Sequence, residues 1–386
     1  MIHFNNAGAS LPPPSVIEAQ VDYLRREAEV GGYRLAQVEA HRINDFYPAA
    51  AEVLSAHARN IAWVGSATEA FNRAVSSIHW SQGDIVLTTR ADYVSNQLAF
   101  LQLQQRYGIQ LERLPDGASG YDPDALKDRL AKGPLPRLIS ITHVPTNRGI
   151  AQDIITAGKL ARQYGIWYLV DACQSLGQLP LDVSKIGCDF LCATSRKYLR
   201  GPRGGGLLYV SDRVLESGLT PLGVDMQSAE WKSPSAYRPV DDAKRFETWE
   251  RSPATQLATA VALRHLLTQD RPAIYERIQA LAQKLWLALD ALPHTRMVDP
   301  LESLGSGLVL AYFPELDIDP DTLINRLFDQ GLNVKYSTVA GDQYDFKERG
   351  IDWALRASVH YFNEEQEVDT AIDIFRQSGL KAIFAL

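Results

Sequence analysis

Two side chains that could do chemistry stand at the ends of neighbouring apolar segments. Asp171 closes the run W-Y-L-V-D-A, where a carboxylate is costly unless it has a partner. Lys197 follows the run Asp189–Thr194 and precedes a glycine-rich turn. Taken singly, Asp171 could cap a helix and Lys197 could be a solvated surface lysine. Taken together, they could pair with a protonated pyridine nitrogen and form a Schiff base with an aldehyde, as pyridoxal phosphate (PLP) requires.

Three further features would complete such a site. The segment Gly65–Thr68 joins an apolar strand to a helix, and the free N–H groups of a helix start bind phosphate, although a plain cap has the same sequence. The glycines Gly201 and Gly204–Gly206 would let backbone approach a ligand closely. Arg356, in the run A-L-R-A-S-V-H, could be an edge-strand surface residue or could bind a substrate carboxylate through two hydrogen bonds.

These residues need a scaffold, and the chain predicts one in which strands and helices alternate. Strands are expected at Ile61–Gly65, Asp84–Thr89, Leu138–Val144, Trp167–Ala172, Asp189–Thr194 and Gly206–Val210, with helices at 67–78, 95–107 and from Asp153. Continuous apolar strands separated by helices indicate a mostly parallel sheet that is covered on both faces. Such sheets bind ligands at the carboxyl ends of their strands.

After residue 255 the pattern changes to long helices and a few separate strands. Helices are expected at 254–268 and 272–292, strands at Leu308–Phe313, Leu332–Tyr336 and Leu355–His360, and further helices near 320–330 and from Glu364. We therefore expect an arm (1–15), a large domain (16–255) and a smaller C-terminal α/β domain (256–386), against which the arm can pack.

Composition and charge limit the class of protein. The chain has 386 residues, 46% hydrophobic and 22% charged, as in ordinary globular proteins. Its net charge is −7 and no basic stripe predicts nucleic-acid binding. The sequence shows no secretory signal and no apolar run long enough for a membrane span. The three cysteines, Cys173, Cys188 and Cys192, suit neither a disulfide framework nor a zinc site. We expect a cytoplasmic protein with reduced cysteines and no metal.

Eight motifs, in order along the chain, resemble those of the class V aminotransferase group of fold-type I PLP enzymes. They are N-N-A-G-A-S, G-S-A-T-E-A-F-N, D-Y-V-S-N, T-H-V-P-T-N-R-G, V-D-A-C-Q-S, T-S-R-K-Y-L-R-G-P-R-G, R-F-E-T-W-E-R-S-P-A and L-R-A-S-V-H-Y-F-N. The group includes cysteine desulfurases, C–S lyases, isopenicillin N epimerase-like proteins and kynureninase. The resemblance implies an α/β, fold-type I PLP-dependent transferase: a large domain with a mostly parallel seven-stranded sheet covered by helices, and a smaller C-terminal α/β domain.

The resemblance also implies how the cofactor would be held. Lys197 would carry it as a Schiff base and move the proton at the substrate α-carbon. Asp171 would pair with the pyridine nitrogen and Gln174 with the phenolic oxygen. The phosphate would be bound by Ala67, Thr68, Thr194 and Arg196.

Contacts to the substrate and to a second subunit follow from the same resemblance. Arg356 would bind the carboxylate of a small amino acid substrate, helped by Asn6 in the arm. Ser252 would reach the phosphate in a neighbouring subunit, which implies a homodimer with shared active sites.

Two segments depart from the desulfurase pattern. Where a histidine commonly stacks on the cofactor ring, this chain reads D-Y-V-S-N, so either Tyr93 or Val94 would face the ring. The segment V-P-T-N also differs, so Thr146 or Asn147 could touch the cofactor.

Sequence bears on the reaction mainly through cysteine. A desulfurase needs a thiolate shortly before the carboxylate-binding arginine, and the stretch Ser337–Trp353 has none. The motifs V-P-T-N-R-G, R-F-E-T-W-E and L-R-A-S-V-H-Y-F-N resemble those of hercynylcysteine sulfoxide lyases and related cysteine-conjugate C–S lyases. That resemblance implies α,β-elimination on a cysteine conjugate or its sulfoxide, which gives pyruvate, ammonia and a sulfur product.

Other reactions of the group stay open. A class V aminotransferase would need a route for a second amino acceptor. An epimerase would need a second acid/base, for which Tyr93, His143 or His360 could serve. A protein that keeps the fold without turnover is disfavoured, because Lys197, Asp171, Gln174 and Arg356 are all present.

Overall fold

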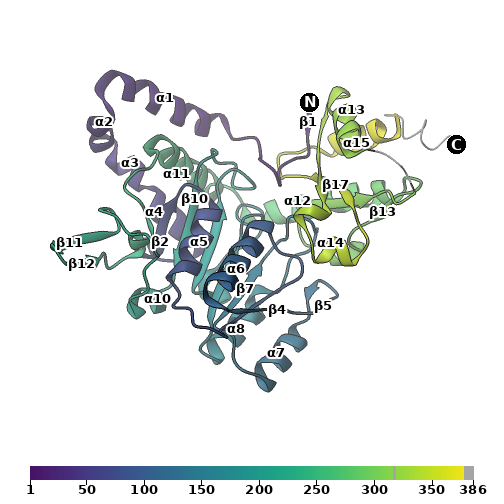
Figure 1. Ribbon diagram of the computed structural model, residues 1–386. Coiled ribbons are helices and arrows are strands. Elements are labelled where there is room, and N and C mark those ends of the chain that lie inside the picture. The colour runs from purple at the N-terminus through teal and green to yellow at the C-terminus, as the bar shows by residue number, and fades with distance from the viewer. Residues whose placement is uncertain (316–318, 378–386) are drawn as a thin grey trace.

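The computed structural model describes residues 1–315 and 319–377 and contains a larger and a smaller α/β unit (Figure 1). The larger unit is built on a seven-stranded sheet in the order β2-β10-β9-β8-β7-β3-β4. Its strands are β2 (Ile61–Val64), β3 (Ile85–Thr88), β4 (Gln110–Arg113), β7 (Leu138–Thr142), β8 (Trp167–Asp171), β9 (Phe190–Thr194) and β10 (Gly206–Val210). All run in the same direction except β10, which pairs antiparallel with β2 and β9. The predicted sheet is thus confirmed.

Helices cover both faces of this sheet because its strands are apolar on both sides. In β8, for example, Leu169 and Val170 belong to two different buried clusters. One cluster joins the sheet to α4 (Phe46–Leu54), α8 (Ile154–Gln163) and α11 (Pro253–Leu267). The other joins it to α5 (Ala67–Ser77) and α6 (Val94–Tyr107). The carboxyl ends of the parallel strands are therefore left as the place where a ligand can enter.

Side-chain caps begin the helices that flank the sheet. Asp153 accepts the N–H groups of Ile155 and Thr156 at the start of α8, as predicted for a helix beginning there. Ser66 accepts the N–H of Glu69 at 3.1 Å at the start of α5. These caps satisfy backbone donors that the helix leaves without partners.

The N-terminal arm connects the two units. Strand β1 (Ile2–His3) pairs in parallel with β15 (Leu332–Asn333) of the smaller unit. The chain then enters α1 (Pro14–Val30), α2 (Gly32–Val38), α3 (Ala40–Asn44) and α4, of which α1, α3 and α4 pack against α11 of the larger unit.

The smaller unit is a four-stranded antiparallel sheet covered by helices (Figure 1). Its strand order is β13-β14-β17-β16. The strands are β13 (Arg296–Met297), β14 (Leu308–Tyr312), β16 (Lys335–Thr338) and β17 (Trp353–Ser358), and the helices are α12 (Arg271–Asp290), α13 (Pro320–Asp329), α14 (Asp345–Glu348) and α15 (Glu365–Gln377). Helix α11 packs against α1, α3 and α4 of the larger unit, and the expected domain boundary at residue 255, near the start of this helix, stays a prediction.

Several elements were not expected from the sequence. Strand β4 has the sequence Q-L-E-R and is only half buried, so the apolar pattern of the inner strands is missing at this sheet edge. A hairpin of β11 (Ala229–Ser233) and β12 (Ala236–Pro239) projects from the larger unit (Figure 1). The remaining elements are β5 (Asp116–Gly117), β6 (Gly120–Tyr121), α7 (Pro123–Lys132), α9 (Val183–Ile186) and α10 (Asp212–Ser217). Within the two described ranges, no helix is both long enough and apolar enough to cross a lipid bilayer.

Candidate active site

A pocket opens where β7, β8 and β9 end and α5 and α6 begin. It encloses about 640 Å³ of empty space, open mouth included, which is within the size range of small-molecule sites. Nine of the predicted site residues line it: Ala67, Thr68, Tyr93, Thr146, Asp171, Gln174, Thr194, Arg196 and Lys197. The pocket therefore gathers residues that lie up to 130 positions apart in the sequence.

Asp171 and Lys197 face this pocket from neighbouring strands. Strand β8 ends at Asp171, which is paired in register with Cys192 of β9, and Lys197 follows β9. The Asp171 carboxylate is buried and accepts hydrogen bonds from the Cys173 N–H and the Asn96 amide, both at 2.9 Å. Its position is therefore fixed by donors on both oxygens.

The Lys197 side chain is buried, with only 7% of its surface exposed. Its amine makes no hydrogen bond or ion pair within the described residues, and it lies 5.8 Å from the centre of the Tyr93 ring. Burial lowers the pKa of Lys197, and the positive charges of Arg196 and Arg356 lower it further, whereas Cys173 and Asp171 oppose the shift. A lowered pKa increases the fraction of neutral amine, which is the nucleophilic form.

A buried network supports Asp171 from behind, and the sequence reasoning gave it no role. Asn96, which donates to Asp171, also donates to Asp92 at 3.0 Å. Asp92 accepts from Thr142 at 2.5 Å and from Gln97 at 2.7 Å. Burial raises the pKa of Asp92, and these donors oppose that shift. The signal was the four-residue spacing of Asp92 and Asn96 at the start of α6.

The other end of the pocket has the features of an anion site. At the start of α5, Ser66 Oγ accepts from the Glu69 N–H and the Glu69 carboxylate accepts from the Gly65 N–H, whereas the N–H groups of Ala67 and Thr68 have no acceptor within the described chain. Arg196 is half-buried in the same pocket, and burial lowers its pKa. Free N–H groups at a helix start beside a guanidinium are a typical phosphate site.

The glycines after Lys197 serve chain packing as well as the pocket. Gly204 and Gly205 line the pocket. A Cβ on Gly206 would lie 2.9 Å from the Ala193 carbonyl and 3.1 Å from the Ala67 nitrogen. Only glycine therefore lets β10 pass so close to the start of α5.

Arg356 lies beside the pocket, next to Thr146. Its Nη1 donates to the Thr146 hydroxyl at 3.0 Å, and its buried Nε has no partner within the described chain. Burial lowers the pKa of Arg356. Thr146 also accepts from Gln174 Nε2 at 3.0 Å, and Gln174 Oε1 has no partner. Both Thr146 and Gln174 therefore connect the arginine to the pocket.

Two predicted contacts are not made in this single chain. The Asn6 amide donates to the Ser358 carbonyl at 2.7 Å and its oxygen accepts from Ser10 at 2.8 Å. These bonds use the Asn6 side chain to hold the arm on β17, and a role of Asn6 in substrate binding stays a prediction. Ser252 is exposed and caps α11 by accepting from Thr255. Its contact with a second subunit stays a prediction.

The pocket lining also reduces the candidates for the residue beside the cofactor ring and for a second acid/base. Tyr93 lines the pocket, whereas Val94 does not. His143 and His360 are buried and do not line the pocket. Asn96, Thr142, Val144 and Cys173 line it as well, although the sequence reasoning did not name them as site residues.

The residues present fit PLP. That cofactor needs an amine for its aldehyde, a carboxylate for its ring nitrogen, a polar group for its phenolic oxygen and an anion site for its phosphate. Lys197, Asp171 and Gln174 supply the first three, and Gln174 Oε1 is buried without a partner as though a group were missing beside it. The start of α5 with Arg196 supplies the fourth.

Comparison with known proteins agrees with this geometry. A probable cysteine desulfurase from Pyrococcus abyssi is 25% identical over 384 residues, covering 98% of this chain and 94% of that protein. The apo structure of the cysteine desulfurase from Thermococcus onnurineus has a TM-score of 0.89 at 24% identity, covering 100% of this chain and 95% of that chain. The cystine C–S lyase C-DES, in complex with its reaction product cysteine persulfide, has a TM-score of 0.86 at 22% identity and 97% coverage of each chain.

These structural likenesses confirm the fold-type I architecture that the resemblance implied. The profile of the Aminotransferase class-V family matches residues 2–370, which is almost the whole chain. The chain therefore belongs to the aminotransferase class-V family of PLP-dependent enzymes.

Proposed function

We propose that the protein is a PLP-dependent carbon–sulfur lyase. It performs α,β-elimination on a cysteine conjugate or its sulfoxide: the Cβ–S bond breaks, the sulfur leaves as a thiol or sulfenic acid, and water completes the release of pyruvate and ammonia. No net oxidation occurs, so no further reactant is needed. The cysteine desulfurases and the cystine lyase among its relatives, which act at the same kind of bond, support this chemistry.

The positions of the three cysteines favour elimination over a reaction in which sulfur is transferred to a cysteine of the protein. Cys188 and Cys192 are fully buried in the larger unit, where burial raises their pKa. Cys173 lies in the pocket wall beside Asp171, and burial raises its pKa well above the usual range. Thiolate is the form that attacks sulfur. None of the three is therefore suited to accept it.

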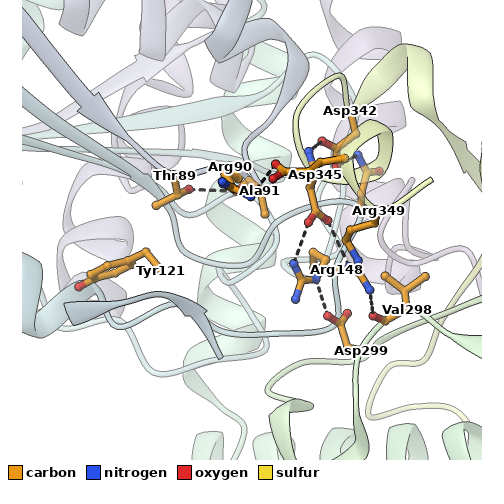
Figure 2. Close-up of polar contacts among 12 residues, drawn as sticks. Thr89, Arg90, Ala91, Tyr121, Arg148, Val298, Asp299, Asp342, Asp345 and Arg349 are labelled. Carbon is orange, nitrogen blue, oxygen red and sulfur yellow. Dashed lines mark hydrogen bonds and ion pairs between the residues drawn. The ribbon is translucent and has the colours of Figure 1, made fainter. Parts of the chain in front are cut away.

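The segment that precedes Arg356 is also anchored. Figure 2 shows Arg148, in the T-N-R-G loop, between Asp299 and Asp345. Asn147, the preceding residue, donates to Asp342 at 3.1 Å. All five side chains are buried. These bonds hold α14 against the loop that carries Thr146. The segment before Arg356 is therefore held in place, whereas a desulfurase would need a mobile loop there to carry its catalytic cysteine.

The proposed roles follow from the position of each group. Lys197 would hold the cofactor covalently and, once released as a neutral amine, would remove the proton from the substrate Cα. Arg356, positioned by Thr146, binds the substrate carboxylate through its free N–H groups. Asp171 would pair with the ring nitrogen and favour its protonated form, and PLP when bound would supply the electron sink for the α-carbon. Tyr93 would lie beside the cofactor, and Ala67, Thr68, Thr194 and Arg196 would hold its phosphate.

A homodimer is part of the proposal. Ser252 is exposed at the start of α11 and, in this arrangement, reaches the phosphate site of a second copy. Exposed aromatic side chains near it support an interface: 86% of the Tyr33 surface and 47% of the Trp249 surface are accessible in the single chain. Both line a surface groove together with Pro253.

An assay with a panel of substrates tests the function. The PLP-loaded protein is incubated with cysteine, cystine and S-substituted cysteines and their sulfoxides, and pyruvate, ammonia and sulfur products are measured. Equal amounts of pyruvate and ammonia from one conjugate support the lyase. Alanine with sulfane sulfur would show a desulfurase. A keto acid formed only with an added amino acceptor would show transamination.

Racemisation is the remaining competitor. Of the three residues considered as a second acid/base, only Tyr93 lines the pocket. Loss of optical activity without pyruvate would favour an epimerase.

A further inference from the structure

We propose that His360 is a positioning residue for Lys197. It fixes the position of the lysine through a hydrogen bond to the backbone carbonyl of Tyr198, the residue that follows Lys197. The proposal rests on the proposed function, in which Lys197 carries the cofactor and moves the α-proton. His360 does not line the pocket, so it can act only through the turn that carries the lysine.

The turn after Lys197 is tight and has one unusual backbone conformation. The Arg200 N–H donates to the Lys197 carbonyl at 2.9 Å and the Gly201 N–H to the Ser195 carbonyl at 2.8 Å. Arg200 has a φ of +61°, a left-handed backbone conformation that residues other than glycine rarely adopt. Such a conformation costs on the order of 1–3 kcal/mol and persists only where the surroundings hold it.

His360 is one of the groups that hold this turn. Its Nε2 lies 3.0 Å from the Tyr198 carbonyl, and its Nδ1 accepts the Tyr361 N–H at 2.9 Å. The second bond makes Nδ1 the acceptor, so the proton is on Nε2, which donates to Tyr198. Burial lowers the pKa of His360 to about 3. The ring is therefore neutral, in a single tautomer, throughout the working range of an enzyme.

The two residues that follow His360 hold the same turn from its other end. The Tyr361 hydroxyl accepts from Arg200 at 2.7 Å, and the Phe362 ring lies 4.4 Å from the Arg200 guanidinium carbon. Arg200 also donates to the Leu11 carbonyl in the N-terminal arm at 2.9 Å. The H-Y-F segment thus fixes both the carbonyl after Lys197 and the residue with positive φ.

The same strand end links the lysine to the substrate site. Arg356 lies in β17, and His360 follows it by four residues along the same chain segment. The Ser358 hydroxyl between them accepts the Ala7 N–H at 2.9 Å, which ties the arm to this segment. One segment, residues 356–362, therefore fixes both the position of the carboxylate-binding arginine and the position of the turn that carries Lys197. A shift of about 1 Å in such a catalytic group can cost two orders of magnitude in rate.

Two substitutions at residue 360 separate positioning from packing. His360→Gln places an amide N–H near the Nε2 position and keeps the donor to Tyr198. His360→Asn places its polar atoms near Nδ1, so it keeps the acceptor for Tyr361 and loses that donor. Both remove the same ring, so loss of packing affects them alike.

Three readouts are compared in wild type and both variants. They are hydrogen exchange at the 196–201 turn in cofactor-free protein, the pH titration of the absorbance of cofactor bound to Lys197, and kcat with KM. We expect His360→Asn to exchange faster at the turn, to shift the titration and to lose about tenfold or more in kcat with KM within about twofold. His360→Gln should stay near wild type in all three.

Equal behaviour of the two variants would overturn the proposal, whether both are impaired or both are normal. If His360→Asn cannot be purified, Tyr361→Phe decides, because it removes the hydroxyl that accepts from Arg200 and leaves both hydrogen bonds of His360 in place. Unchanged exchange and kcat in Tyr361→Phe would then count against the proposal. Failure of the proposed function has a different signature: borohydride reduction of wild type would leave Lys197 unmodified, while exchange in cofactor-free protein would still report on the turn.

Discussion

Asn96 Nδ2 lies 2.9 Å from Asp171 Oδ2 and 3.0 Å from Asp92 Oδ1, so one amide holds two buried carboxylates in place. Thr142 closes the network by donating to Asp92. Two negative charges so near each other repel, and donors between them offset the repulsion. The carboxylate that would face the cofactor ring is thus positioned by a residue on a neighbouring helix.

Asn96→Ala should weaken cofactor binding. It leaves both carboxylates one donor short, and an unsatisfied buried polar group costs about 1–3 kcal/mol. We expect PLP affinity to fall about 5- to 150-fold, measured by fluorescence titration of the cofactor-free protein. Gln102→Ala, on the outer part of α6, is the control and should bind PLP like wild type. Unchanged affinity in Asn96→Ala would show that Asp171 needs no support.

Lys197→Ala should abolish turnover. The variant has neither the amine that binds the cofactor nor the base at Cα, so PLP should bind non-covalently only. Borohydride reduction followed by peptide mass spectrometry should find the cofactor on the 195–200 peptide of wild type and not of the variant. Wild-type turnover in Lys197→Ala would contradict the lysine assignment.

Arg356→Ala should raise KM for an α-carboxylate substrate. A hydrogen bond to a charged group contributes about 1.5–3 kcal/mol, which corresponds to about 10- to 150-fold. The exposed Arg90, which pairs with Glu348 across the surface, provides the control Arg90→Ala. Steady-state kinetics with both variants decide the matter, and equal KM values would mean that another group holds the carboxylate.

Arg148→Met should destabilise the fold more than any exposed ion pair does. The change leaves Asp299 buried without a cation and Asp345 with Arg349 alone, at 3.4 Å, and breaking a buried pair costs about 3–5 kcal/mol. The matched change Arg90→Met should cost less than about 1 kcal/mol. Urea denaturation measures the free energy of unfolding of both variants. Similar losses relative to wild type would show that the buried ion pairs of Arg148 do not anchor the loop.

Acid should destabilise the protein through its buried histidines. Burial lowers the pKa of His143 to about 4 and that of His360 to about 3, whereas an unfolded histidine has a pKa of about 6.5. The unfolded chain therefore binds more protons below pH 6.5, and stability present above that pH is lost as the pH falls through 4. Burial raises the pKa of Asp342 to about 6, so this group has the opposite effect and adds to the stability as the pH falls below 6.

The free energy of unfolding, measured from pH 7 to pH 4, checks this expectation. His143→Gln should make the decline shallower than in wild type. The same slope in both proteins would exclude His143 as a source of the acid sensitivity.

Local rules in the sequence predicted the larger sheet, Asp171, Lys197 and the turn at Gly65–Thr68. The other predicted pocket residues came from the family resemblance, and Asn96, Thr142, Val144 and Cys173 were missed. Buried parallel strands are continuous apolar runs, so β7, β8 and β9 could be recognised one at a time. Parallel strands end at one edge, so Asp171 and Lys197 had to lie near each other. The exposed edge strand β4 has no such pattern and was missed.

Only the tertiary structure decided which side chains support the site. Asn6 and His360 both looked available for chemistry, and both are occupied by bonds to segments far away in the chain: Asn6 to Ser358, and His360 to Tyr198. The placement of α11 on the larger unit and the Arg148 ion pairs depend in the same way on long-range packing. Hydrogen bonds between distant segments leave no periodic trace in a sequence, because each partner is chosen by the folded geometry and not by its neighbours along the chain.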